Sequence, residues 1–216
     1  MRIIIMGPPG VGKGTEAEIL VKHYNIPHIS TGNIFRELFH EDTEIGKIAK
    51  SFIDRGELVP DDITNEIVRQ RLSKDDVEKG FLFDGYPRNI EQAKAFDQIL
   101  TEKGWKLDAV INIQASDDLI ISRISGRRVC KNCGSIYHMT NKPPQKDGVC
   151  DKCGGKLIQR DDDSKETVLR RLKIYYNQTE PVIGYYKNSG LMVNADGSQA
   201  IAKANADIMK VLGEMN

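Results

Sequence analysis

The sequence has no excess of charge of either sign, no long apolar run and few aromatic residues. Lysine and arginine together number 31, as do aspartate and glutamate, so the chain of 216 residues is formally neutral. This balance argues against a protein that binds DNA or RNA regardless of sequence. The first apolar segment ends at Gly7, and we find no stretch long enough to span a bilayer, so we expect no signal peptide, no membrane partner and a cytoplasmic protein.

Internal repeats, low-complexity tracts and Ser/Gly linkers are also lacking. The chain is long enough to bury one substantial core. Any smaller unit should therefore be an insertion within a single chain fold. Cysteine is confined to 4 residues, all between positions 130 and 153, which singles out that segment for a role of its own.

The N-terminal segment is typical of a strand that opens into a phosphate-binding loop. Residues 2–6 read Arg-Ile-Ile-Ile-Met, and residues 7–15 read Gly-Pro-Pro-Gly-Val-Gly-Lys-Gly-Thr. A helix with an apolar face at Ala17, Leu20, Val21 and Tyr24 follows, so its free amide groups and positive dipole end point back at the loop. Isolated matches to such loops occur in proteins that bind no nucleotide, but the strand before and the helix after this one favour nucleotide binding.

Within the loop, Gly10, Gly12 and Gly14 allow the backbone to approach phosphate oxygens, and Lys13 adds a mobile positive charge. The residue after the lysine usually supplies a hydroxyl that ligates Mg²⁺, but here it is Gly14, and the hydroxyl comes one residue later at Thr15. We therefore do not expect the loop to ligate a metal directly.

Short apolar runs alternate with helical patterns along most of the chain. They lie at 2–6, 26–30, 81–84, 109–113 and 191–194, with helices expected after Pro60, after an Asn89 cap and from about Ser198 to Leu212. This alternation predicts an α/β fold with a parallel sheet. Ligands collect at the carboxyl ends of such strands, so Gly7, Ser30 and Asp84 should face one crevice.

The segment 126–163 breaks this alternation and is predicted to be a small inserted β domain. It contains two Cys-x-x-Cys pairs separated by sixteen residues, a spacing typical of zinc sites. Four thiolates would close a tetrahedron with no open position, so the metal would be structural. Paired disulfides and a nucleic-acid-binding zinc ribbon remain alternatives. His138 is nearby but surplus as a ligand. The candidate ligands are Cys130, Cys133, Cys150 and Cys153.

Phosphoryl transfer depends on alignment and on positive charge around the transferred group, so its arginines should converge. Most arginines on helices are solvated surface charges, and Arg55, Arg69, Arg71, Arg128 and Arg170 are interpreted this way. The candidates near turns, strand ends or the insertion are Arg36, Arg88, Arg123, Arg127, Arg160 and Arg171.

Asp84 ends an apolar strand and is followed by Gly-Tyr-Pro-Arg at 85–88. A carboxylate beside a phosphate loop indicates Mg²⁺. Because this ion dehydrates reluctantly and Gly14 brings no hydroxyl, we expect Asp84 to hold the water shell of the ion. The alternative is that Asp84 is only a strand-end cap.

Taken together, these motifs resemble the adenylate kinase family, in the long bacterial form whose lid carries a zinc site. The resemblance covers essentially the whole chain. It rests on the loop 7–15, Ser-Thr-Gly at 30–32 with Arg36, Gly-Glu-Leu-Val-Pro at 56–60, Asp-Gly-Tyr-Pro-Arg at 84–88 with Gln92, Gly-Arg-Arg at 126–128, and Arg-Asp-Asp at 160–162 with Arg171.

The resemblance implies a P-loop three-layer fold with a five-stranded parallel sheet, a helical AMP-binding insertion and a small zinc-ribbon-like β lid. The core would comprise 1–29, 60–125 and 164–216, the AMP-binding domain 30–59 and the lid 126–163. It also implies reversible phosphoryl transfer between ATP and AMP giving two ADP, by a monomer. Closure of the two insertions would exclude water, which would otherwise hydrolyse ATP.

The resemblance also assigns residues to the two nucleotides. Lys13 would follow the transferred phosphoryl group, Arg123 would stack on the ATP adenine, and Pro87 would be cis. The ATP set is Gly10, Val11, Gly12, Lys13, Gly14, Thr15, Arg123, Arg127, Ile136, Tyr137 and Gln199. The AMP set is Thr31, Arg36, Glu57, Leu58, Val59, Gly85, Tyr86, Pro87, Arg88, Gln92, Arg160 and Arg171. The catalytic set is Lys13, Arg36, Asp84, Arg88, Arg127, Arg160 and Arg171.

Three positions depart from the commonest family pattern: Asn33 replaces a frequent Asp, Tyr86 a frequent Phe and Asn89 a frequent Thr. Asn at position 89 also occurs in kinases of pyrimidine monophosphates, so UMP or CMP remains an alternative acceptor, although Thr31 and Gln92 favour adenine. A nucleotide-dependent switch is a further alternative. Against a GTPase switch, the nearest match to Asn-Lys-x-Asp, at 141–144, lacks the Asp.

Overall fold

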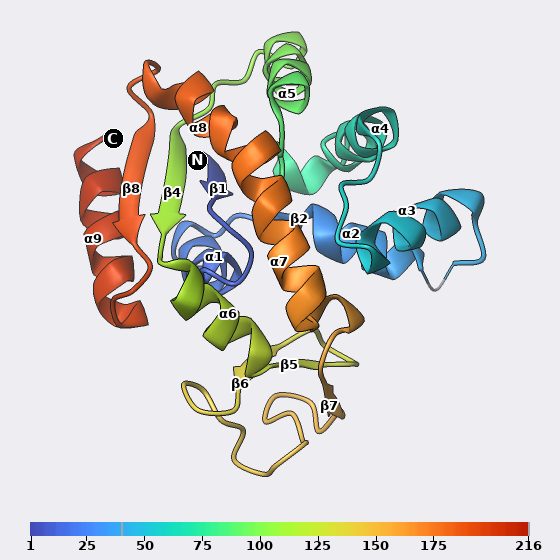
Figure 1. Cartoon of the computed structure of the whole chain (residues 1–216). Coiled ribbons are helices and arrows are strands. Elements are labelled where there is room, and N and C mark those ends of the chain that lie inside the picture. The colour runs from blue at the N-terminus through green and yellow to red at the C-terminus, as the bar shows by residue number, and fades with distance from the viewer. Residues whose placement is uncertain (40, 216) are drawn as a thin grey trace.

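The computed structural model describes residues 1–39 and 41–215. Residues 40 and 216, which fall in the predicted AMP-binding and core ranges, lie outside the described residues. Within the described part of the chain, a five-stranded parallel sheet has the order β2-β3-β1-β4-β8 (Figure 1). Its strands are β1 (Arg2–Met6), β2 (His28–Ser30), β3 (Phe81–Asp84), β4 (Ala109–Gln114) and β8 (Met192–Asp196). The predicted parallel sheet is therefore confirmed.

The two faces of the sheet build two cores, because alternate side chains of a strand point to opposite faces. Ile3 and Ile5 of β1 pack with α1 (Lys13–Tyr24) and α9 (Ile201–Glu214). Ile4 and Met6 pack on the opposite face with α4 (Asp61–Arg71), α5 (Ile90–Glu102) and α8 (Glu180–Lys187). Burial on both faces explains why β1 is a continuous apolar run rather than an alternating one.

Among the element boundaries that differ from the sequence prediction, two have clear local reasons. β2 begins at His28 rather than Ile26, because the Ile26 amide donates to the Val21 carbonyl and so completes the end of α1. The last helix begins at Ile201 rather than near Ser198, because the Ser198 backbone and hydroxyl both bond the Asp196 carboxylate in a turn. The predicted cap at Asn89 is present, since its side chain accepts from the Gln92 amide.

Two smaller units extend from this core (Figure 1). The first contains α2 (Thr31–Leu38) and α3 (Glu44–Asp54), whose apolar residues form a cluster around Phe35 and Ala49 together with Ile67 of α4. The second, between α6 (Asp117–Ser125) and α7 (Lys165–Ile174), contains an antiparallel sheet of order β6-β5-β7. Its strands are β5 (Arg127–Cys130), β6 (Ile136–His138) and β7 (Leu157–Ile158).

Short turns complete the chain. Asp75–Val77 (η1) and Asp161–Asp163 (η2) are 3₁₀ turns, and a π-helical turn at Tyr175–Thr179 (η3) joins α7 to α8. The resulting long helix crosses the molecule beside the sheet (Figure 1). Among the described residues, no helix is both long and apolar enough to span a membrane.

Candidate active site

The loop between β1 and α1 has the backbone that an anion site requires. Gly10 and Gly12 have φ values of 79° and 116°, a region that other residues rarely adopt. Gly12 precedes α1 without any side-chain cap, so the first amides of that helix remain available to a ligand. The Lys13 ammonium donates to the carbonyls of Gly7 and Pro8 at 2.7 and 2.8 Å, and burial lowers its pKa to about 8.

The glycine at position 14 has a structural explanation that the loop sequence alone does not supply. A Cβ placed there would lie 3.3 Å from Ile136 Cδ1, which belongs to β6 in the inserted unit. That separation is tighter than most contacts made by a Cβ. Gly14 therefore leaves room for Ile136 of the inserted unit to pack against the loop. The side-chain hydroxyl that usually follows the loop lysine is absent at this position.

A large cleft lies over this loop and receives residues from distant parts of the chain. Arg123 comes from α6, Ile136 and Tyr137 from β6, and Gln199 from the turn after β8. The Arg123 guanidinium donates to the Val11 carbonyl at 2.9 Å, which connects α6 to the loop. Every residue predicted for ATP lines this cleft.

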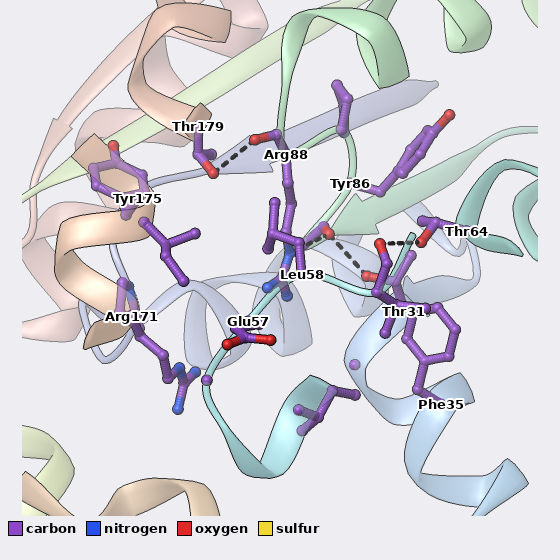
Figure 2. Close-up of a pocket in the computed structure, with 18 of the residues that line it drawn as sticks. Thr31, Phe35, Glu57, Leu58, Thr64, Tyr86, Arg88, Arg171, Tyr175 and Thr179 are labelled. Carbon is purple, nitrogen blue, oxygen red and sulfur yellow. Dashed lines mark hydrogen bonds between the residues drawn. The ribbon is translucent and has the colours of Figure 1, made fainter. Parts of the chain in front are cut away.

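A smaller cleft lies between the α2–α3 unit, the 56–59 turn and the segment after β3 (Figure 2). Thr31 donates to the Gly85 carbonyl at 2.8 Å, and Arg88 Nε donates to the same carbonyl at 2.7 Å. The Tyr86–Pro87 bond is cis, as the resemblance implies. Every residue predicted for AMP lines this cleft except Arg160, which lines the large cleft instead.

The two clefts meet at a shared wall that contains four cationic side chains. Lys13, Arg36, Arg88 and Arg171 line both clefts. Burial lowers the pKa of each, and for Arg88 to about 10. Such a concentration of partly desolvated positive charge is costly without an anion, and it would stabilise a polyanion placed between the clefts.

Two carboxylates that follow Arg160 each hold one arginine of the large cleft. The sequence analysis gave neither carboxylate a role. Asp163 has no exposed side chain and pairs with Arg127, while Asp162 accepts from Arg171 Nη1 at 2.8 Å. Burial opposes ionisation of Asp162, but Arg171 and Arg127 outweigh it and lower its pKa. The sequence carries no local signal for this role, because only the fold brings Asp163 to Arg127 and Asp162 to Arg171.

Asp84 lines the large cleft with Ser30, as predicted for strand ends, whereas Gly7 lines the smaller cleft. His28, a residue that sequence reasoning missed, lies with Nε2 3.6 Å from Asp84 Oδ2. Burial opposes ionisation of Asp84, but His28, Lys13 and Arg88 outweigh it, so the pKa of Asp84 is lowered. A histidine in a short strand carries no sequence signal of its own, because only the strand pairing brings it to Asp84.

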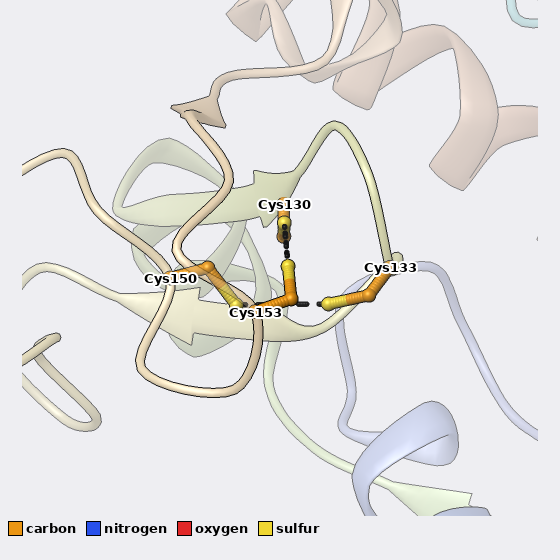
Figure 3. Close-up of side chains that lie close together, drawn as sticks. All are labelled: Cys130, Cys133, Cys150 and Cys153. Carbon is orange, nitrogen blue, oxygen red and sulfur yellow. Dashed lines mark hydrogen bonds between the residues drawn. The ribbon is translucent and has the colours of Figure 1, made fainter.

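The four cysteines of the inserted unit converge (Figure 3). Their sulfur atoms all lie within 4.8 Å of one another, with Cys130 to Cys153 at 3.5 Å and Cys133 to Cys150 at 3.6 Å. A zinc ion with bonds of about 2.3 Å to each thiolate requires sulfurs roughly 3.8 Å apart, whereas a disulfide requires about 2.05 Å. All four cysteines are free, so the arrangement fits a tetrahedral metal and not the disulfide alternative.

Tyr137 connects this cluster to the large cleft, which it also lines. Its oxygen lies 3.5 Å from Cys150 Sγ and accepts from the Asp151 amide at 2.8 Å. The tyrosine hydroxyl is therefore directed to the sulfur, and this contact lowers the pKa of the Cys150 thiol to about 6. A lowered thiol pKa favours the thiolate that metals bind.

Comparison with known proteins gives a consistent result across the whole chain. The family model described as "Adenylate kinase" matches residues 5–191. The adenylate kinase of Caldicellulosiruptor bescii is 55% identical over 213 residues, 99% of either chain. That of Thermoanaerobacter sp. (strain X514) is 52% identical over 214 residues, again 99% of either chain. That of Bacillus pumilus is 52% identical over 216 residues, the full length of both.

Proposed function

Because this chain belongs to the adenylate kinase family, we propose which of its residues carry the reversible transfer of a phosphoryl group between ATP and AMP, giving two ADP. The observation that supports the assignment is the shared wall of the two clefts. Each cleft has its own lining, and Lys13, Arg36, Arg88 and Arg171 belong to both. A donor in one cleft and an acceptor in the other would bring their phosphates together among these cations.

ATP binds in the large cleft. Its phosphates lie on residues 10–15 and its base lies near Arg123 and Gln199, which line the same cleft. Lys13 releases the carbonyls of Gly7 and Pro8 and turns to the outer phosphates, because an anion is a stronger partner for an ammonium than two neutral carbonyls. Arg127 and Arg160 approach the phosphates from the lid side of the cleft.

AMP binds in the smaller cleft, with its phosphate directed to Arg36 and Arg88 and its base towards Gln92, which is 1% exposed. In-line transfer then needs only alignment and charge neutralisation, because phosphoryl transfer requires little covalent help from a protein. The guanidinium groups surround the equatorial oxygens as the donor and acceptor approach each other.

Residues 30–59 and 126–163 act as two closing units on the core formed by 1–29, 60–125 and 164–216. The buried cluster of 126–163 lies wholly within that unit, and the cluster of 30–59 is separate from the two main cores although it includes Ile67 of α4, which supports movement of each unit as a body. Some contacts that reach across, such as Lys152 to Glu18 at 3.8 Å and Arg170 Nη1 to the Arg55 carbonyl at 2.7 Å, are exposed and weak, whereas the pair of Asp162 with Arg171 is partly buried. Weak bridging contacts allow the units to open for substrate exchange.

Adenylate kinases use Mg²⁺, and Asp84 fits the role of holding its hydration shell, because its carboxylate lines the ATP cleft and the loop position that usually supplies a hydroxyl ligand is Gly14. The ion neutralises phosphate charge when it is bound. In the lid, the four cysteines fit zinc by their sulfur spacing. Zinc there would keep the small unit folded, since its buried cluster consists of Cys130, Tyr137, Cys150 and Leu157, of which two are cysteines of the set itself.

The assignment is tested with a bisubstrate analogue that joins two adenosines through phosphates. One molecule should bind per chain, protect amides in both clefts from hydrogen exchange, and compete with ATP and with AMP. Because both clefts are lined by one chain, binding should not require a second copy. A coupled ADP assay with AMP, UMP and CMP as acceptors completes the test. Rapid ATP consumption that depends on AMP supports the proposal, and a preference for UMP or CMP contradicts it.

A further inference from the structure

The side-chain amide of Gln92 is buried in the wall of the smaller cleft with one bond on each end. Its Oε1 accepts from the Arg88 backbone N–H at 2.8 Å. Its Nε2 donates to Asp61 Oδ1 at 2.7 Å. An amide oxygen has two lone pairs and an amide nitrogen two hydrogens, so one acceptor site and one donor site remain for a ligand.

The identities of the two partners fix which way the amide faces. An ionised carboxylate only accepts hydrogen bonds, and a backbone N–H only donates them. If the Gln92 amide rotated by half a turn, its oxygen would face the Asp61 carboxylate and its NH₂ group would face the Arg88 N–H. Both bonds would be lost and replaced by repulsive pairs in a buried place.

Asp61 is in turn held by Asn89. The Asn89 Nδ2 group donates to both oxygens of the Asp61 carboxylate, at 2.9 and 3.0 Å. Its Oδ1 accepts from the Gln92 backbone amide at 2.8 Å, which caps α5. Both ends of the Asn89 side chain are therefore occupied within the protein. This residue, which raised the alternative of a pyrimidine acceptor, supports the Asp61–Gln92 contact instead of reaching into the cleft.

We propose that Asp61 is the positioning residue that sets which purine the acceptor site takes, by fixing the direction of the Gln92 amide. This rests on the proposed binding of AMP in the smaller cleft. The locked amide offers an acceptor and a donor side by side. Adenine presents the complement, a 6-amino donor beside the N1 acceptor. A 6-oxopurine presents the reverse, a 6-oxo acceptor beside an N1–H donor, and would match only the rotated amide.

The experiment compares AMP with inosine monophosphate as acceptors, because the two differ only at position 6 and N1 of the base. The ratio of their kcat/KM values is measured for the wild type and for Asp61→Ala. The loss of the hydrogen bond to Asp61 leaves only the Arg88 backbone N–H to oppose rotation of the amide, so the ratio should fall by about tenfold. Asp61→Ser, which keeps a polar residue at the start of α4 but is too short to reach Gln92, should give the same fall.

Two further variants separate positioning from general support of the fold. Asp61→Asn keeps an oxygen that can accept from Gln92, so it should retain most of the selectivity. Asp62→Ala removes the neighbouring exposed acid from the same helix turn and should leave the ratio unchanged. A ratio unchanged in both Asp61→Ala and Asp61→Ser, with AMP and inosine monophosphate losing rate together, would overturn the proposal. Failure of the wild type to phosphorylate AMP would instead overturn the proposed function.

Discussion

Replacing Arg88 by Lys is the sharpest test of the shared wall between the two clefts. Arg88 Nε donates to the Gly85 carbonyl at 2.7 Å, and its backbone carbonyl accepts from the Thr179 hydroxyl at 2.8 Å. With Nε engaged, the two terminal nitrogens form the fork that faces the clefts. A lysine retains the charge and the Thr179 contact but loses the Gly85 bond and the fork.

The expected loss follows from these contacts. Both lost bonds have the charged guanidinium as donor, and a hydrogen bond to a charged group contributes about 1.5 to 3 kcal/mol. Together they contribute about 3 to 6 kcal/mol, which corresponds to a loss of roughly a hundredfold or more in rate. Most of the loss should appear in kcat rather than in KM, because the phosphate charge that the two terminal nitrogens stabilise develops during transfer.

The assay is steady-state ADP formation in a coupled system, with AMP varied at saturating ATP and the reverse. Arg69→Lys is the matched control, because Arg69 pairs with Glu102 on the exposed surface and should keep wild-type kinetics. Thermal unfolding of both variants should stay close to that of the wild type, since Thr179 still holds the backbone at position 88. A kcat for Arg88→Lys within a few-fold of the wild type, with the fold intact, would refute the role of the fork.

Three other outcomes are expected. Removal of the lid metal by a chelator should lower the thermal midpoint much more than the initial rate, and an immediate loss of activity with the fold intact would rule out a structural role. Burial lowers the pKa of Lys13 to about 8, and phosphate favours its charged form, so ATP affinity should be level below that pH and fall above it. Calorimetry in buffers of different ionisation heat should detect proton uptake on ATP binding at pH 8.5. The absence of proton uptake at that pH would contradict the lowered pKa. His28→Ala should lower kcat about tenfold and raise the Mg²⁺ concentration needed for half-maximal rate, because Asp84 loses a neighbour 3.6 Å away. His28→Gln should restore both values. If neither variant changes the rate, His28 has no role in the site.

The strands and the phosphate loop could be predicted because their signals are local. The apolar run at 2–6 and the glycines of 7–15 need no distant partner to be recognised. The boundaries of β2 and α9 were less predictable. The Ile26 amide bonds to the end of α1 and the Ser198 amide bonds in a turn, and these hydrogen bonds compete with those of the strand and the helix. Asn89 was recognised as a cap, but its second contact with Asp61, across 28 positions, carries no local signal.

For the candidate site, the sequence supplied the types of residue, and the resemblance supplied their grouping. Neither the sequence nor the resemblance identified the residues that hold these side chains in place. Asp163 beneath Arg127, and Asp162 beside Arg171, are acids among several in the chain until folding removes them from water. Burial is what turns an ordinary ion pair into one that fixes a side chain, and burial is a property of the folded protein.

The sequence by itself determined the elements and the chemistry they offer: a buried parallel sheet, a phosphate-loop motif, four thiols at the spacing of metal ligands and a set of arginines. Periodicity and spacing carry this information, because they act over a few residues. Only the tertiary structure decided that four cations share one wall between two clefts, that Gly14 leaves room for Ile136, and that Asp61 directs the amide of Gln92. Those arrangements join residues far apart in the chain, and they arise only when packing brings the strand ends and the inserted units together.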